Sequence, residues 1–115
     1  MLAKKSRLKK NNDFDLVFKK GKSAYGKLLG VKIINNQKAS NRFGIILGLK
    51  VSKKAVIRNL FKRRIRAIIR GEQGRFKNGY DVVVIVLPAI SGAAYQDILS
   101  ELKIIFERLK FYQKP

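Results

Sequence analysis

Residues 52–70 constrain the fold of this chain more than any other segment, because their apolar residues recur with the period of an α-helix. Five cationic residues of the segment fall within an arc of about 140° on the opposite face, whereas Arg64 lies at the edge of the apolar stripe. Such a helix must bury its apolar stripe against another layer and leave its charged face outside. The stripe contains Ile57, Phe61, Ile65 and Ile68. The cationic face contains Arg58, Lys62, Arg63, Arg66 and Arg70.

The charge of the chain is concentrated around this helix. No acidic residue lies between Lys50 and Arg70, whereas an ordinary solvated helix intersperses Glu to gain favourable i,i+4 pairs. The 115 residues include 27 Lys and Arg against 7 Asp and Glu, a formal net charge of +20, and nearly all of the excess lies in residues 1–70. A charge of this size repels itself, so the sequence indicates a polyanionic partner whose phosphate oxygens the guanidinium groups suit.

Apolar residues are nonetheless abundant, at 46%, which is enough to build one hydrophobic core. We therefore expect a single domain over residues 1–115, in which residues 1–10 form a flexible basic tail. The longest apolar run, Val82–Leu87, is far too short to span a membrane. These features predict a cytoplasmic protein without a membrane partner.

The composition removes most catalytic chemistry that a polypeptide can carry. The chain has no cysteine and no histidine, so it has no thiolate nucleophile, imidazole base or Cys/His metal site. Asp13 and Asp15 suit the start of a helix, and Asp97, Glu101 and Glu107 are expected on the outer face of the last helix. A two-metal nuclease needs several converging carboxylates, which this pattern does not predict.

Helix signals mark both ends of the chain and the ends of the basic helix. Asn11 or Asn12 is expected to cap a helix that stops at Gly21. Ser52 is a possible N-cap for the basic helix, and Gly71 can end it. A last amphipathic helix is expected to bear Tyr95, Ile98, Leu99, Leu102, Ile105, Phe106 and Leu109.

Three strands are expected between these helices. Leu28–Ile34 and Phe43–Val51 are joined by a polar turn and are expected to pair in antiparallel fashion. The run Tyr80–Leu87 is rich in Val and Ile, and Pro88 ends it. The resulting order, αββαβα, predicts an α/β (α+β) two-layer sandwich in which helices pack on a small mixed sheet.

Two phenylalanines of the first helix, Phe14 and Phe18, admit two interpretations. At i,i+4 spacing they can belong to the core, or one ring can be presented to an unpaired base. Tyr25, Phe43 and Phe76 are weaker candidates for base stacking, and packing in the sheet or in a loop is preferred for them.

Several motifs spread along nearly the whole chain resemble the protein component of bacterial ribonuclease P. The most specific piece is Ser-Lys-Lys followed by the Arg-Asn helix, and the N-terminal Arg-Leu-Lys with Phe-x-x-x-Phe is a second piece. The motifs are Arg7–Phe14, Val17–Gly21, Arg42–Gly44, Val51–Asn59 and Lys62–Arg66.

The resemblance implies a left-handed βαβ crossover and a single RNA-binding domain that serves as one subunit of a ribonucleoprotein. In that family the RNA subunit, with magnesium, removes the 5′ leader of precursor tRNA, and the polypeptide is not the catalyst. The implied partners are the catalytic RNA and precursor tRNA, with no small-molecule substrate and no metal held tightly by the protein. The implied RNA-binding residues are Lys53, Lys54, Arg58, Asn59, Lys62, Arg63 and Arg66. The implied residues of a leader-binding cleft are Phe14, Phe18, Lys50 and Ser52.

The chain departs from the family pattern at three places. Lys54 runs directly into Ala55, where relatives have a few more residues. The Arg-Asn-Arg signature ends in Leu60, and Arg64 lies one turn further along as a possible replacement. Lys32 stands where many relatives have an aromatic residue on the first long strand.

Other classes of protein share parts of this pattern. A ribosomal or other structural RNA-binding protein without a role in tRNA processing would have a similar composition and basic helix. A DNA-binding architectural protein is disfavoured because neither a dimerisation heptad nor helix-turn-helix spacing is visible. A membrane-surface role is weaker still, because the apolar stripe of the basic helix is needed for the core.

Overall fold

The computed structural model describes residues 7–114 and contains three α-helices and a four-stranded sheet. The helices are α1 (Asn11–Lys20), α2 (Ala55–Glu72) and α3 (Tyr95–Arg108). The strands are β1 (Lys22–Tyr25), β2 (Leu29–Asn35), β3 (Arg42–Ile46) and β4 (Tyr80–Val86). Two short 3-10 turns, η2 (Gln73–Arg75) and η3 (Pro88–Gly92), flank β4 in the sequence.

The sheet has the order β1-β2-β4-β3 and is mixed, as expected. The β1–β2 and β2–β4 pairs are antiparallel, whereas β3 and β4 are parallel and are connected through α2. The predicted pairing of Leu28–Ile34 with Phe43–Val51 is wrong, because β4 lies between the corresponding strands β2 and β3. The prediction also missed β1, and it extended β3 to Val51 although the strand ends at Ile46.

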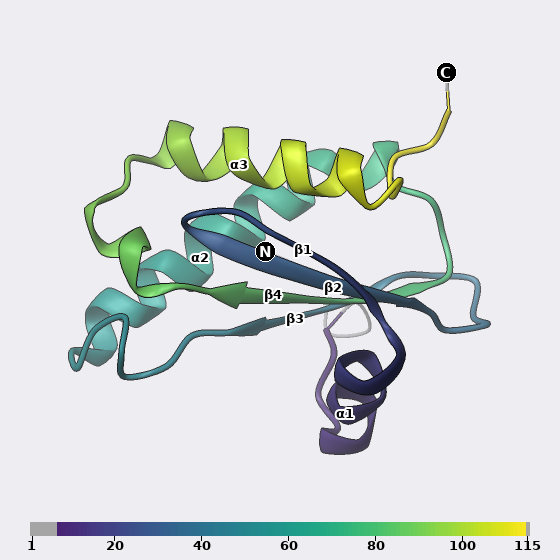
Figure 1. Cartoon of the computed structure of the whole chain (residues 1–115), viewed down its shortest axis with the longest axis horizontal. Coiled ribbons are helices and arrows are strands. Elements are labelled where there is room, and N and C mark those ends of the chain that lie inside the picture. Colours follow the sequence, from purple (N-terminus) through teal and green to yellow (C-terminus); the bar gives the residue numbers. More distant parts are fainter. Residues whose placement is uncertain (1–6, 115) are drawn as a thin grey trace.

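The two faces of the sheet are covered unequally. Figure 1 shows α2 and α3 together on one face and α1 alone on the other. The main core lies between the sheet and α2 with α3, and a small second cluster joins Leu8, Val17 and Val83 beneath α1. Side chains alternate along each strand, so the main core receives Leu29, Val31, Ile33, Val82, Val84 and Val86 from the sheet. The helices contribute Phe61, Ile65, Ile68, Ile69, Ile98, Leu102, Ile105 and Phe106.

The predicted stop of the first helix at Gly21 is confirmed, because Gly21 is the C-cap of α1, whereas the other predicted helix ends differ from the observed ones. Asn11 already lies within α1, and the N-cap position belongs to Lys10 without a side-chain cap. The Ser52 hydroxyl oxygen accepts a hydrogen bond from the Lys54 N–H, 3.1 Å away, before α2 begins at Ala55. Gly71 lies inside α2, which continues into η2. Glu72, the last residue of α2, is buried and accepts a hydrogen bond from the Tyr112 hydroxyl, so tertiary packing carries the helix one residue beyond Gly71.

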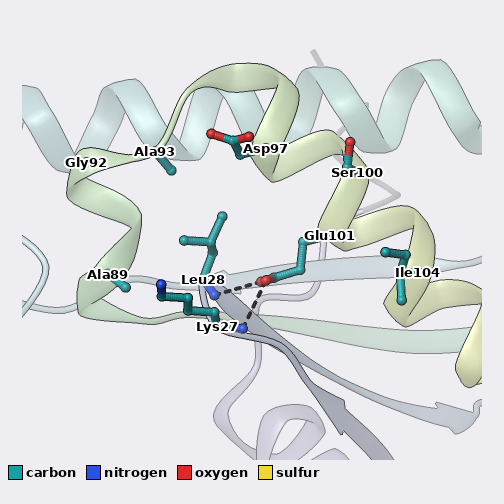
Figure 2. A pocket seen from close by; sticks show the side chains of 9 residues that line it. All are labelled: Lys27, Leu28, Ala89, Gly92, Ala93, Asp97, Ser100, Glu101 and Ile104. Atoms are coloured by element: carbon teal, nitrogen blue, oxygen red, sulfur yellow. Dashed lines mark hydrogen bonds between the residues drawn. The ribbon is translucent and has the colours of Figure 1, made fainter.

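Glu101 of α3 anchors the turn between β1 and β2, and the prediction that it lies on the outer face of the helix is wrong. Its carboxylate accepts hydrogen bonds from the backbone N–H groups of Lys27 and Leu28 (Figure 2) and from that of Leu29, at 2.8–2.9 Å. Hydrogen bonds to an ionised acceptor are roughly twice as strong as neutral ones. The contact therefore fixes β1, the edge strand that precedes this turn, to the helix layer.

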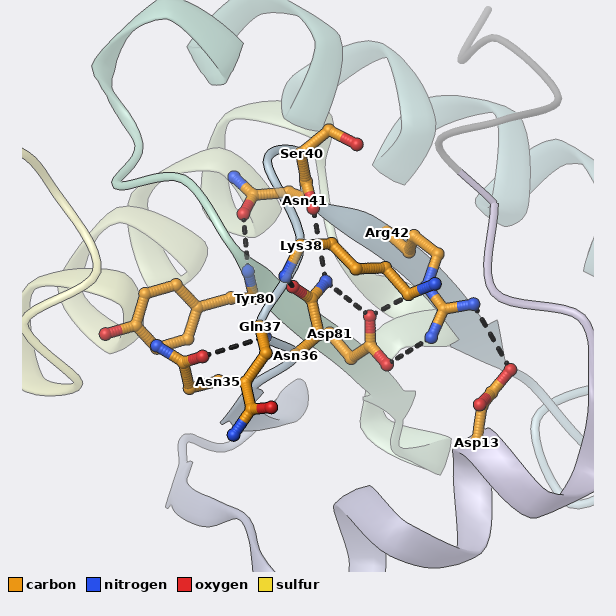
Figure 3. Close-up of polar contacts among 10 residues, drawn as sticks. All are labelled: Asp13, Asn35, Asn36, Gln37, Lys38, Ser40, Asn41, Arg42, Tyr80 and Asp81. Atoms are coloured by element: carbon orange, nitrogen blue, oxygen red, sulfur yellow. Dashed lines mark hydrogen bonds and ion pairs between the residues drawn. The ribbon is translucent and has the colours of Figure 1, made fainter.

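Arg42 links β3 to β4 and α1 through its guanidinium group. Its Nε and Nη2 atoms donate to the two carboxylate oxygens of Asp81 at 2.9 and 2.6 Å, and Nη1 donates to Asp13 at 3.3 Å (Figure 3). Asn36 donates to the same Asp81 carboxylate at 2.9 Å. The hydrogen bond to Asp81 is the main cause that raises the pKa of Arg42. The pair with Asp81 thus joins β3 to β4, and the pair with Asp13 connects α1 to β3.

The segment before α1 also packs on the sheet. Arg7 forms an isolated bridge with Phe43 of β3, and the Leu8 N–H donates to the Phe43 carbonyl at 2.7 Å. Leu8 is buried. The predicted flexible tail is therefore wrong for Arg7 and Leu8, and residues 1–6 of that tail lie outside the described residues. Within residues 7–114, no helix is both long and apolar enough to cross a membrane.

Candidate nucleic-acid interface

The cationic face of α2 forms a shallow depression on the outside of the molecule. Its predicted apolar stripe is confirmed, since Phe61, Ile65 and Ile68 are buried and Ile57 is half-buried. The opposite face therefore points to solvent. The depression is lined by Val56, Asn59, Lys62, Arg63 and Arg66, so the fold brings four of the predicted RNA-binding side chains together.

The other predicted RNA-binding residues lie at the start of the same helix. Lys53 and Lys54 are exposed just before α2 begins. Arg58 is half-buried, and its Nη1 donates to the Ser52 carbonyl at 2.9 Å, so this side chain also holds the preceding loop. Arg64 is directed to the Phe61 ring, whose centroid lies 5.7 Å from the guanidinium carbon. Its role as a replacement for the arginine missing at position 60 stays a prediction.

Helix α1 covers only part of the sheet face on which it packs, and we call this face the open sheet face. The two phenylalanines of α1 differ in how far they are exposed there. Phe14 is half-buried over Gly44 of β3, where a Cβ atom would collide with its ring. Phe18 is 38% exposed, and the Lys32 ammonium group of β2 lies 5.2 Å from its ring centroid. Phe14 therefore packs against the sheet, whereas Phe18 presents its ring to solvent beside a cation.

Tyr25 is a further exposed ring on this open face. It is 46% exposed and lies over Gly30 of β2, where any side chain would collide with it. Gly30 and Lys32 are two residues apart and so share one face of β2. Tyr25 therefore lies over the same face of β2 as Lys32, which Phe18 contacts. Phe43 and Phe76, the other weaker candidates, are buried in the core as preferred.

Sequence reasoning gave Tyr25 low weight because β1 is short and polar and was not recognised as a strand. A signal was nevertheless present, since Gly30 is a glycine within an apolar strand, and such glycines often mark a close approach by another group. The strand register explains the contact, because Tyr25 of β1 is paired directly with Gly30 of β2.

Lys50 and Ser52, the remaining predicted cleft residues, lie in the loop that follows β3. Lys50 is exposed and Ser52 is half-buried. In Figure 1 the chain after β3 continues to the start of α2, whereas α1 lies under the sheet. These two residues are thus placed beside the basic helix, and their contact with a leader stays a prediction.

Several acidic side chains make contacts that stabilise the fold. Asp81 and Asp13 bind Arg42, and Glu101 binds backbone N–H groups. Buried Glu72 accepts a 2.7 Å hydrogen bond from the Tyr112 hydroxyl, and burial together with this bond raises the pKa of Tyr112. Over the described part of the chain, no three acidic side chains gather in a way that could hold a metal ion.

Comparison with known proteins gives a consistent result. The sequence model of the family described as Ribonuclease P matches residues 2–110. A ribonuclease P protein component from Synechocystis is 43% identical over 108 residues, which cover 93% of this chain and 87% of the relative. The solved RNase P protein of Staphylococcus aureus has a TM-score of 0.87 at 28% identity, covering 94% of this chain and 98% of that one. That of Thermotoga maritima has a TM-score of 0.80 at 32% identity, covering 89% and 96%. The chain belongs to the ribonuclease P protein family.

Proposed function

We propose that this chain, as the protein subunit of a ribonuclease P, binds the catalytic RNA through α2 and the single-stranded 5′ leader of precursor tRNA through the open sheet face. The observation that carries the leader assignment is the pair of exposed rings on one face of β2, Phe18 beside Lys32 and Tyr25 over Gly30. Bases stack on such rings without regard to sequence, and a cation beside one of them suits a phosphate.

The polypeptide contributes binding rather than bond cleavage in this proposal. Its positive charge lowers the repulsion between two polyanionic RNAs, and the effect fades with added salt. The catalytic RNA supplies the reacting groups, and magnesium is expected to act together with this RNA subunit. The cytoplasm is the expected compartment of the particle. The alternative, a structural RNA-binding protein without a role in tRNA processing, finds no support among the relatives.

Reconstitution tests the proposal. The purified polypeptide alone is expected to leave precursor tRNA uncut, because the chain has no histidine or cysteine and no three carboxylates of residues 7–114 converge. Cleavage at the leader junction should require the candidate catalytic RNA and a divalent ion, and the protein should increase it at low RNA concentration. Robust cleavage by RNA-free protein would overturn the assignment of the chemistry to the RNA.

The salt dependence of binding to the catalytic RNA tests the role of α2. If roughly five or six phosphates are neutralised, a plot of log affinity against log salt should have a slope of about −4 to −5. Replacing Lys62 and Arg63 with alanine should flatten the slope by about one unit for each lost contact. Lys103→Ala, which removes an exposed positive charge from α3, is the control and should leave the slope unchanged. A slope near zero for the parent protein would show that α2 has been misassigned.

A further inference from the structure

A small pocket at the β3 edge of the sheet lies where the two proposed RNA surfaces meet. It has a volume of about 250 Å³ and is lined by residues of the N-terminal segment, α1, β3 and α2. Its cationic side chains are Arg7, Lys9 and Arg66. Phe14 forms part of its wall, so the pocket adjoins the helix that carries Phe18. Arg66 also lines the depression on α2, so one side chain belongs to both surfaces.

Arg7 has an unusual environment in this pocket. Its backbone is fixed by the bridge to Phe43 and by the neighbouring Leu8 hydrogen bond. Its Nε atom is buried and has no hydrogen-bond partner among the described residues. A buried N–H donor without a partner is costly, and few occur in native proteins. A ligand that accepts a hydrogen bond at this position would remove the cost.

The chemistry of the lining selects an anion. Among the described residues no carboxylate lines the pocket, and Asp13, which precedes the lining residue Phe14, is paired with Arg42. Burial lowers the pKa of Arg66, and the charge of Arg7 lowers it further, so the two guanidinium groups repel each other across the site. A group with negative charge and several acceptor oxygens would relieve this repulsion. Planar guanidinium forks match the oxygens of phosphate in particular.

We propose that this pocket binds one phosphodiester group of RNA, with Arg7 and Arg66 donating hydrogen bonds to its oxygens. The inference rests on the proposed function for the identity of the RNA, but the pocket can be tested without it. The phosphate can come from the leader as it leaves the open sheet face, or from the catalytic RNA that lies along α2. Both sources present the same chemistry, and the RNA measurements below distinguish them.

The first experiment uses the isolated protein and inorganic phosphate. Sodium phosphate replaces sodium chloride at constant ionic strength while the Arg7 Nε–Hε signal is followed by NMR. A saturable shift of this signal is expected, and Arg66→Gln should raise the dissociation constant of phosphate at least about tenfold, because it removes charge-assisted hydrogen bonds to the phosphate oxygens. Arg108→Gln, which removes the same charge from α3, should leave it unchanged. Absence of a saturable shift, or an equal response in Arg66→Gln, would overturn the proposal.

The second experiment uses the reconstituted particle and Arg7→Gln, with Arg66→Gln as an independent variant and circular dichroism to confirm folding. A leader phosphate predicts about tenfold weaker binding of leader-bearing substrate with unchanged binding of mature tRNA. A phosphate of the catalytic RNA predicts weaker assembly and unchanged discrimination between the two substrates. If neither changes, the pocket does not bind RNA. Failure of the parent protein to favour leader-bearing substrate would refute the proposed function instead, and the phosphate titration would still decide the pocket.

Discussion

Replacing Arg42 with leucine is expected to lower the free energy of unfolding by about 3–5 kcal/mol. Asp81 is 3% exposed, and both of its oxygens accept hydrogen bonds from Arg42. Leucine would leave the buried carboxylate with Asn36 as its remaining side-chain partner. Denaturant unfolding of the two proteins under the same salt conditions measures the difference.

Two further variants separate this effect from the loss of a surface charge. Asp13→Asn removes the longer and more exposed contact of Arg42, and it should cost no more than about 1 kcal/mol. The double variant Arg42→Leu with Asp81→Leu removes both charges and should recover much of the lost stability, since no buried charge is left unpaired. A loss below about 1 kcal/mol for Arg42→Leu would show that the pair with Asp81 does not stabilise the fold.

Leader recognition should depend on the two exposed rings. Phe18→Leu and Tyr25→Leu keep apolar bulk and remove the flat surface on which a base stacks. Each is expected to weaken binding of leader-bearing substrate to the reconstituted particle by about 1–3 kcal/mol, with little change for mature tRNA. The melting temperature should change little, because neither ring belongs to either hydrophobic cluster.

Phe14→Leu provides the comparison, because Phe14 is half-buried over Gly44. A core role predicts a lower melting temperature and equal effects on both substrates. If the Phe18 and Tyr25 variants discriminate between the substrates as well as the parent does, the leader does not stack on these rings. The open face would then bind it through basic and backbone groups alone.

The sequence was sufficient to predict the elements whose periodic pattern is long. The helical stripe of α2 and the Val/Ile run of β4 both lie in the core as expected. Each of these patterns describes burial along a single element. Burial is what hydrophobic periodicity reports, so such predictions are independent of which neighbour provides the cover.

Neighbour relations were harder to predict, because they depend on contacts between distant segments. Placing β4 between β2 and β3 requires knowledge of where the chain returns after α2. The short polar strand β1 is defined by pairing with β2 and by the anchor on Glu101, neither of which a local pattern reveals. The same limit applies to the site, since Tyr25 gains its position from Gly30, and Arg7 gains its position from Phe43.

The most direct test of the account compares precursor tRNA with mature tRNA, each titrated with the catalytic RNA alone and with the RNA plus protein. The protein is expected to strengthen binding of the leader-bearing substrate by more than it strengthens binding of mature tRNA. Combining Phe18→Leu with Tyr25→Leu should remove most of that difference while the particle still assembles. Equal strengthening of both substrates by the parent protein would contradict the central claim that the open sheet face binds the leader.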